Sequence, residues 1–258
     1  HLKDAPNTIS EAELARVSKH FEAMPYETLP SHDISFNAAV ASNPAFAAWV
    51  KRCVHQHKIA GYRAVTLSLK PHGKAPGDAT SEQMWAVADL ADAYSFGELR
   101  VSHEQNLILA DVKLSDLYAL WEKARENGLT TPNIGLLTDI ICCPGGDFCS
   151  LANAKSIPLS AEIAAKLAPI EEELGPIAIN VSGCINACAH HHVGHIGVLG
   201  VEKAGEDWYQ VLVGGRPDGA GALAVLTGKA VREEEVPAII DRLARHYLAV
   251  RESGESFI

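Results

Sequence analysis

The sequence has no long apolar run and an excess of acidic over basic residues. No apolar stretch approaches the roughly 20 residues that a helix needs to cross a bilayer, so we do not expect a membrane protein. Lys and Arg number 22 against 32 Asp and Glu, which gives a formal net charge of −10. A chain of this charge, without basic runs interleaved with aromatics, should repel nucleic acid and anionic membranes.

The first residues, His1 to Asp4, have neither an initiator Met nor the charged-then-apolar plan of a signal peptide. They read as the cut end of a longer chain. The 258 residues can bury a substantial core without disulfides, although five of the six cysteines lie within 47 residues. We therefore expect a cytoplasmic protein whose clustered cysteines form a metal or redox site.

Periodicity divides the chain into three parts and indicates an α+β protein. Residues 1–43 are interpreted as a linker with one helix, because Ser10 and Glu13 have the capping-box spacing. Residues 44–132 follow the order helix, strand, helix, strand, strand, helix, which is typical of a small ferredoxin-like module. The helices open near 44, 81 and 115, and the strands cover 63–69, 99–101 and 107–109.

Residues 133–258 have a different character and predict an α/β domain. Short apolar strands, expected at 136–141, 177–181, 196–201 and 208–213, alternate with the loops that hold the cysteines. One helix is expected to open at Ser160, and a final amphipathic helix should run from about 234 to 252.

Four of the cysteines form two pairs, Cys143 with Cys149 and Cys184 with Cys188. Two such pairs on turns that follow strands can direct four thiolates at the corners of a [4Fe–4S] cube. The spacing leaves zinc, inert buried thiols and redox disulfides open as alternatives. Cys53 lies on the apolar face of a helix and should be a core residue. Cys142 should point away from its neighbour Cys143.

The segment Val181–Cys188, with the sequence VSGCINAC, resembles the signature of the sirohaem-dependent nitrite and sulfite reductases. In that signature six residues follow the last cysteine before an acid and an apolar-Gly-apolar run. Here Ile196-Gly197-Val198 supplies the run, but His195 stands in the place of the acid. Residues 99–107, LRVSHEQNL, are similar to the family's LRxTxxQNL stretch, and Gly214-Gly215 also fits. The resemblance covers about 46 to 258.

The resemblance implies a [4Fe–4S] cluster on Cys143, Cys149, Cys184 and Cys188, with Cys188 as the catalytic ligand that bridges to the iron of sirohaem. The implied reaction is the six-electron reduction of sulfite to sulfide. Nitrite reduction to ammonia by the same site and an electron-transfer module without sirohaem are the alternatives.

Sirohaem carries eight carboxylates, so its pocket needs cations and N–H donors. The candidates are Arg100, Gln105, Asn106, Asn186, His190, Gly214, Gly215 and Arg216. The two arginines could instead be solvated charges, and Gln105 and Asn106 could cap a hairpin loop. His190 to His192 and His195 could contact the cofactor, deliver protons, bind metal or lie passively at the surface. Lys70 and Lys74 are expected to be solvated.

Members of this family contain two related halves, each with a ferredoxin-like module. One such module is evident in this chain, which therefore resembles the C-terminal half. The resemblance implies that the N-terminal half of the same enzyme is a partner and supplies most of the cations that grip the substrate anion. A flavoprotein or a ferredoxin would donate electrons. We expect this segment not to be active alone.

Overall fold

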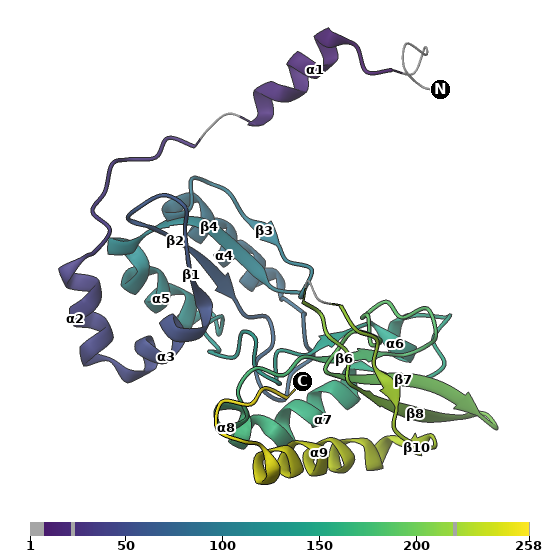
Figure 1. Cartoon of the computed structure of the whole chain (residues 1–258). Helices are drawn as coiled ribbons and strands as arrows, with labels where there is room; N and C mark the ends of the chain where they lie inside the picture. The colour runs from purple at the N-terminus through teal and green to yellow at the C-terminus, as the bar shows by residue number, and fades with distance from the viewer. Residues whose placement is uncertain (1–7, 22–23, 219–220, 258) are drawn as a thin grey trace.

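The computed structural model describes residues 8–21, 24–218 and 221–257. The supposed cut end at His1 to Asp4 lies outside these residues. Helix α1 (Glu11–Ser18) begins at Ser10, whose Oγ accepts a hydrogen bond from the Glu13 N–H at 3.2 Å. It is followed by the 3₁₀ turn η1 (Lys19–Phe21), and neither element has a buried residue. Figure 1 shows this segment extending away from the rest of the chain.

The expectation of a single helix in residues 1–43 is wrong. A second helix, α2 (Ile34–Ser42), begins at Asp33, whose carboxylate accepts a hydrogen bond from the Phe36 N–H at 2.8 Å. Its side chains Phe36, Ala39 and Val40 pack against the core of the module that follows. The Pro-rich stretch before α2 concealed this helix, because its start depends on one Asx cap.

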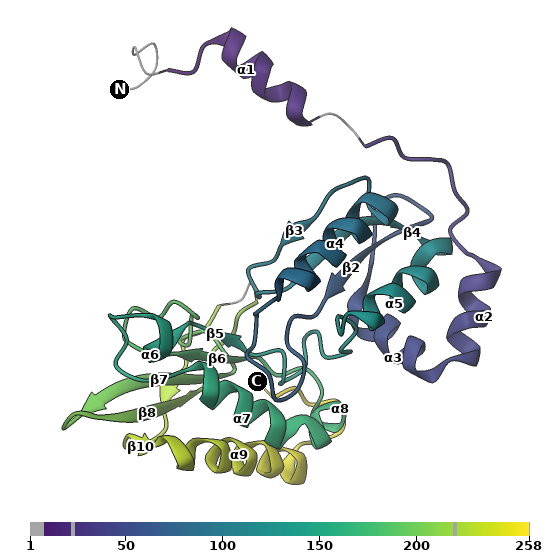
Figure 2. The ribbon, with the colours of Figure 1, turned by 180° about the vertical axis from the view of Figure 1, so that it is seen from behind.

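The first module is a four-stranded antiparallel sheet in the order β1-β2-β4-β3, covered by helices. Figures 1 and 2 show α4 and α5 on the same side of this sheet. Phe46, Trp49 and Trp121 are at the centre of its core. The strands are β1 (Val54–Gln56), β2 (Tyr62–Leu67), β3 (Arg100–Val101) and β4 (Leu107–Lys113), and the helical segments are α3 (Pro44–Cys53), α4 (Ser81–Tyr94), η2 (Leu114–Asp116) and α5 (Leu117–Glu126).

The second module is a mixed sheet in the order β10-β8-β7-β6-β5, with β9 also paired to β8. Strands β5, β6 and β7 are parallel, whereas β7 and β8 form an antiparallel hairpin. Figures 1 and 2 show α7 and α9 side by side along this sheet. The strands are β5 (Ile141–Cys142), β6 (Ile179–Ser182), β7 (Ile196–Lys203), β8 (Glu206–Val213), β9 (Val225–Leu226) and β10 (Val231–Arg232), and the helical segments are α6 (Gly145–Phe148), α7 (Ile157–Leu167), η3 (Ala168–Ile170), α8 (Glu171–Leu174), η4 (Glu233–Glu235) and α9 (Val236–Val250).

Two expected elements of the second module have different bounds in the structure. The strand expected over 136–141 is reduced to Ile141–Cys142, because Leu137 and Ile140 enter the core from an irregular segment instead. The helix expected from Ser160 starts at Ile157, since Pro158 occupies its first turn. The mixture of helices and sheets confirms the α+β class. Within the described residues, no helix is long and apolar enough to span a membrane.

The two modules meet along a buried polar seam that contradicts the expectation of a solvated Lys70. Lys70 is 2% exposed. Its Nζ donates to Asp139 Oδ1 at 2.7 Å and to the Glu104 carbonyl at 2.5 Å. Lys51 and Arg52 of α3 both pair with Glu172 of α8, which adds a second polar link between the modules. The seam fixes the segment that leads into β5.

Candidate functional site

The two cysteine pairs lie on loops that leave neighbouring parallel strands at the same edge of the sheet. Cys143 directly follows β5, and Cys184 comes two residues after the end of β6. Cys142 is paired with Val181 in the parallel register, and the Cys143 N–H donates to the Val181 carbonyl at 3.1 Å. Because parallel strands end at a common edge, the fold brings the two loops side by side.

Close contact between these loops depends on glycine. A Cβ on Gly183 would lie 2.9 Å from the Gly145 Cα and 2.6 Å from the Ala154 carbonyl oxygen. Gly145 itself has a φ of +60°. The amides of Asn153 and Ala154 donate to the Gly183 carbonyl at 2.9 and 3.0 Å. The loop after Cys149 is thus tied to the loop that carries Cys184.

The surroundings of Cys143 suit a thiolate ligand. Its Sγ accepts a hydrogen bond from the Gly183 N–H at 3.0 Å and lies 3.5 Å from the Ser156 Oγ. Cys143 is only 8% exposed. Donors to the sulfur favour the charged form, which is the form that binds iron.

The other three cysteines of the pairs differ in exposure. Cys149 is half-buried, and its N–H closes α6 by donating to the Gly145 carbonyl at 2.9 Å. Cys184 is buried and Cys188 is exposed. The chain reverses between them through Ala187, which has a φ of +56°. The exposed position of Cys188 leaves its sulfur accessible to a second group.

The two remaining cysteines are core residues, as expected. Cys142 packs among the apolar side chains between the second sheet and its helices, and burial raises the pKa of its thiol to about 11. Cys53 packs in the core of the first module, where burial raises the pKa of its thiol to about 12. All six cysteines are free thiols. In the part of the chain that the structure describes, no three His, Cys, Asp or Glu side chains converge where one metal ion could bind.

Gln105 and Asn106 connect the first module to the cysteine strand. The Gln105 side chain donates to the Cys142 carbonyl at 2.6 Å and accepts from the Cys142 N–H at 2.9 Å, so it pairs with β5 as a neighbouring strand would. Asn106 is fully buried, and it accepts from the Leu69 N–H and donates to Asp139 Oδ1 at 3.0 Å. In this structure the amide groups of both residues bond to the protein itself.

The other candidate residues for sirohaem fall into two groups. Arg100 is exposed on β3 and pairs with Glu98, and Asn186 is exposed in the loop before Cys188. Gly214, Gly215 and Arg216 lie against the histidine-rich loop, residues 189–195. The Gly214 N–H donates to the His195 carbonyl at 3.1 Å, and a Cβ on Gly215 would lie 2.2 Å from the Gly194 carbonyl oxygen. Arg216 pairs with Asp218 at 2.6 Å.

The histidines of this loop are in different environments. His190 is exposed and has a φ of +55°, whereas His191 is fully buried. Neither ring nitrogen of His191 has a hydrogen-bond partner among the described residues, and its ring lies 3.9 Å from that of His192. Burial, with a smaller effect of His192, lowers the pKa of His191 to about 4. The imidazole is therefore neutral near pH 7.

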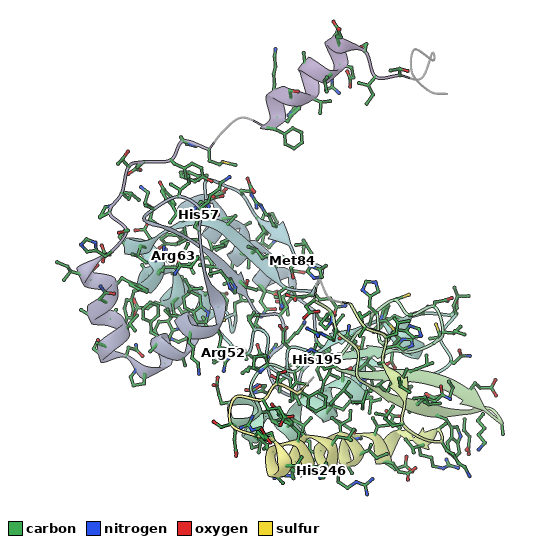
Figure 3. The ribbon with its side chains drawn as sticks, in the orientation of Figure 1. Arg52, His57, Arg63, Met84, His195 and His246 are labelled. Atoms are coloured by element: carbon green, nitrogen blue, oxygen red, sulfur yellow. The ribbon has the colours of Figure 1, made fainter. Side chains whose placement is uncertain are left out.

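His195, which stands where the family signature has an acid, is a hydrogen-bond acceptor. Its Nδ1 accepts a hydrogen bond from the Ala178 N–H at 3.0 Å, which ties the start of β7 to the segment before β6. Figure 3 shows His195 within the second module. Burial lowers the pKa of His195, which favours the neutral ring that this acceptor role requires.

Comparison with known protein families agrees with this site. Residues 56–127 match the nitrite/sulfite reductase ferredoxin-like half domain, and residues 136–255 match the nitrite and sulphite reductase 4Fe-4S domain. The second match includes all four paired cysteines. The chain belongs to the sirohaem-dependent nitrite and sulfite reductase family. The family's cofactors, a [4Fe–4S] cluster and sirohaem, are those that the sequence predicted, and the ferredoxin-like half-domain is confirmed.

Some relatives of this chain are named nitrite reductases and others sulfite reductases. The chain is 31% identical over 215 residues to the chloroplastic ferredoxin–nitrite reductase of Betula pendula, a match that covers 79% of this chain and 35% of that protein. It is 30% identical over 210 residues to sulfite reductase [ferredoxin] 2 of Mycolicibacterium paratuberculosis, with coverage of 76% and 38%. The chain thus spans little more than a third of the length of these relatives.

Solved structures show the same fold. The Mycobacterium tuberculosis NirA protein superposes with a TM-score of 0.66 at 26% identity, over 80% of this chain and 39% of that one. The dissimilatory sulfite reductase I (DsrI) gives a TM-score of 0.62 at 14% identity, over 77% of this chain and 66% of that chain. The second likeness concerns the fold alone.

Proposed function

We propose that this chain is the cluster-bearing C-terminal half of a reductase that converts sulfite to sulfide with six electrons. The observation that carries the proposal is the pairing of the two cysteine loops at the edge of β5 and β6, within the residues that match the family's 4Fe-4S domain. In this proposal Cys143, Cys149, Cys184 and Cys188 hold the cluster. Cys188, which is exposed, would also be accessible to the sirohaem.

When bound, the cluster and sirohaem supply single electrons and an iron at which the anion is reduced. The chain's own residues hold and shield them. The Gly183 N–H stabilises the Cys143 thiolate, and the Gln105 pairing with Cys142 holds the strand from which Cys143 projects. Arg216 supplies a cation close to His195, at the end of the loop that follows Cys188, and the exposed His190 supplies an imidazole within that loop. These groups would contact the sirohaem carboxylates.

Three exposed apolar side chains accompany the cysteine loops. Phe148, Leu151 and Ile185 are each more than 70% exposed. Exposed apolar patches of this kind mark surfaces that a partner or ligand covers. The N-terminal half of the same enzyme is the proposed partner, because the matched relatives are much longer than this chain. Ferredoxin is the proposed electron donor, because the relatives are named as ferredoxin-dependent. The free thiols suit a reducing compartment such as the cytoplasm.

The experiment that tests the proposal is an assay with reduced methyl viologen as electron donor. The full enzyme, with both halves, should release sulfide from sulfite, and this segment alone should not. Robust sulfide production by the segment alone would refute the division of labour between the halves. Faster turnover of nitrite than of sulfite by the full enzyme would favour the alternative, nitrite reduction to ammonia.

A further inference from the structure

Ser156 lies between the cysteine loops, at a position to which no sequence motif points. It directly precedes α7 and is fully buried. Its Oγ donates to the Cys143 carbonyl at 2.7 Å and lies 3.5 Å from the Cys143 Sγ. A Cβ on Gly145 would meet this Oγ at 2.1 Å, so the first cysteine loop closes directly over the hydroxyl. The hydroxyl is therefore held beside a proposed cluster ligand.

Iron binding would change the hydrogen bond that the Cys143 sulfur can form with this hydroxyl. A free thiol can donate its own proton to the Ser156 Oγ, but a ligating thiolate has no proton and can only accept. Hydrogen bonds to a charged acceptor are stronger than those to a neutral carbonyl. The thiolate thus competes with the Cys143 carbonyl for the hydrogen bond of the Ser156 hydroxyl.

The structure lets the hydroxyl turn toward the sulfur without leaving a buried carbonyl unpaired. The Cys142 Sγ also donates to the Cys143 carbonyl, at 3.1 Å. When the Ser156 hydroxyl rotates to the Cys143 Sγ, the thiol of Cys142 still satisfies that carbonyl. This second donor removes the desolvation cost that such a rotation would otherwise carry.

We propose that the Ser156 hydroxyl hydrogen-bonds the Cys143 thiolate and raises the reduction potential of the [4Fe–4S] cluster. The inference rests on the proposed function, since it requires Cys143 to be a cluster ligand. Reduction adds negative charge to the cluster and its thiolates, and a donor to one of those sulfurs stabilises the reduced form. Ser156 is a positioning residue that acts through Cys143, alongside the Gly183 N–H.

A pair of variants of the full enzyme tests the proposal. Ser156→Ala removes the hydroxyl beside Cys143, whereas Ser160→Ala makes the same change one turn later on α7, at another fully buried serine. We expect Ser156→Ala to lower the equilibrium constant for one-electron reduction of the cluster about tenfold, equal to about 59 mV. Ser160→Ala should leave the potential unchanged. Redox titration followed by electron paramagnetic resonance measures both. Equal potentials for Ser156→Ala and the wild type, at equal cluster content, would overturn the inference.

A second measurement detects the proton of the hydroxyl itself. Electron–nuclear double resonance of the reduced wild-type cluster should show a strongly coupled proton that disappears when the enzyme is incubated in D₂O. Where Ser156→Ala retains its cluster, it should lack this coupling and keep the one from the Gly183 N–H. A wild type without any exchangeable hydroxyl coupling would refute the role of Ser156 while leaving the proposed function intact. A wild type without a cluster would refute the proposed function and the inference together.

Discussion

Cys142, the last residue of β5, and Cys143, which directly follows the strand, differ in chemistry because successive side chains of an extended segment point to opposite faces. Cys142 faces the core, where its thiol stays protonated and packs as an apolar group. Cys143 faces the loop of the other cysteine pair and receives the Gly183 N–H. In the loop after Cys188, a turn in which His190 has a φ of +55° buries His191 and leaves His190 and His192 exposed.

Alanine at Cys143 and at Cys142 should therefore have different consequences. Cys143→Ala removes a cluster ligand and should abolish most of the iron and acid-labile sulfide in the anaerobically purified protein. Cys142→Ala removes core packing and a weak hydrogen bond to the Cys143 carbonyl, which keeps the Ser156 hydroxyl as a donor, so it should cost about 1 kcal/mol and retain the cluster. Quantifying iron and sulfide in both variants checks this. Equal losses of iron in the two variants would show that Cys143 is not a ligand.

The buried His191 should make the protein less stable in weak acid. Its pKa is lowered to about 4 from an ordinary 6.5, so between these pH values the unfolded chain binds a proton that the folded chain does not. Stability therefore falls as pH drops through this window, by about 2 kcal/mol at pH 5. His191→Leu removes this loss, so its gain in unfolding free energy should be larger at pH 5 than at pH 7.5.

Urea unfolding at the two pH values measures this difference. The exposed His246 of α9 provides the control, because its replacement by Leu leaves the surroundings of His191 unchanged. A pH-independent effect of His191→Leu would contradict the buried, neutral state of this imidazole.

At the scale of helices and strands, local sequence patterns were sufficient to predict an element wherever it has a strong hydrophobic period or a capping residue. Ser10 caps α1 as expected, and the long amphipathic α9 lies within the range that its apolar stripe predicted. The strands around the second cysteine pair, β6 and β7, were also predicted to within a few residues at each end. The motifs identified the two cysteine pairs because their spacing is local information.

Elements and contacts that depend on distant residues were missed. β1 has three residues and follows α3 without a turn, so it has no period of its own. The buried state of Lys70 depends on Asp139, 69 positions later. The role of Ser156 depends on the folding of its loop against Gly145, which no spacing rule expresses. These features depend on contacts between residues far apart in the sequence, so local patterns could not predict them.

Lys70 and Asp139, in the seam between the modules, should each stabilise the fold only while the other is present. Lys70→Met leaves the Asp139 carboxylate buried near only neutral donors, and we expect a loss of about 3–5 kcal/mol in unfolding free energy. The double variant Lys70→Met/Asp139→Leu removes both charges and should recover much of that loss. Denaturant unfolding of the single and double variants gives the coupling. A double variant as unstable as the sum of two single variants would contradict a direct pairing.

The Gln105 side chain should hold β5 in place. Gln105→Ala leaves the N–H and carbonyl of Cys142 without these partners, at an expected cost of about 1–3 kcal/mol. The amide of Cys142 should then exchange with solvent faster. Glu104→Ala, an exposed side chain in the same loop, is the control and should leave exchange at Cys142 unchanged. Unaltered exchange in Gln105→Ala would show that β6 alone holds the strand.

At the scale of the whole molecule, two cores are joined by polar contacts, and the proposed cofactor site lies where the second sheet ends. Each module has its own apolar cluster. The seam of Lys70, Asp139 and Asn106 connects them next to the strand that leads to Cys143. The exposed apolar side chains beside the cysteine loops mark the face at which the other half of the enzyme would complete the site.

Metal and cofactor content of the full enzyme, purified without oxygen, tests the cluster assignment most directly. Iron, acid-labile sulfide and extracted tetrapyrrole should be present in the proportions of one [4Fe–4S] cluster and one sirohaem, together with a haem-like absorption spectrum. Replacing Cys188, the thiolate that the proposal assigns to both cofactors, with Ser should disturb both signals at once. A protein that contains one zinc and no labile sulfide would contradict the assignment of these four cysteines to a cluster.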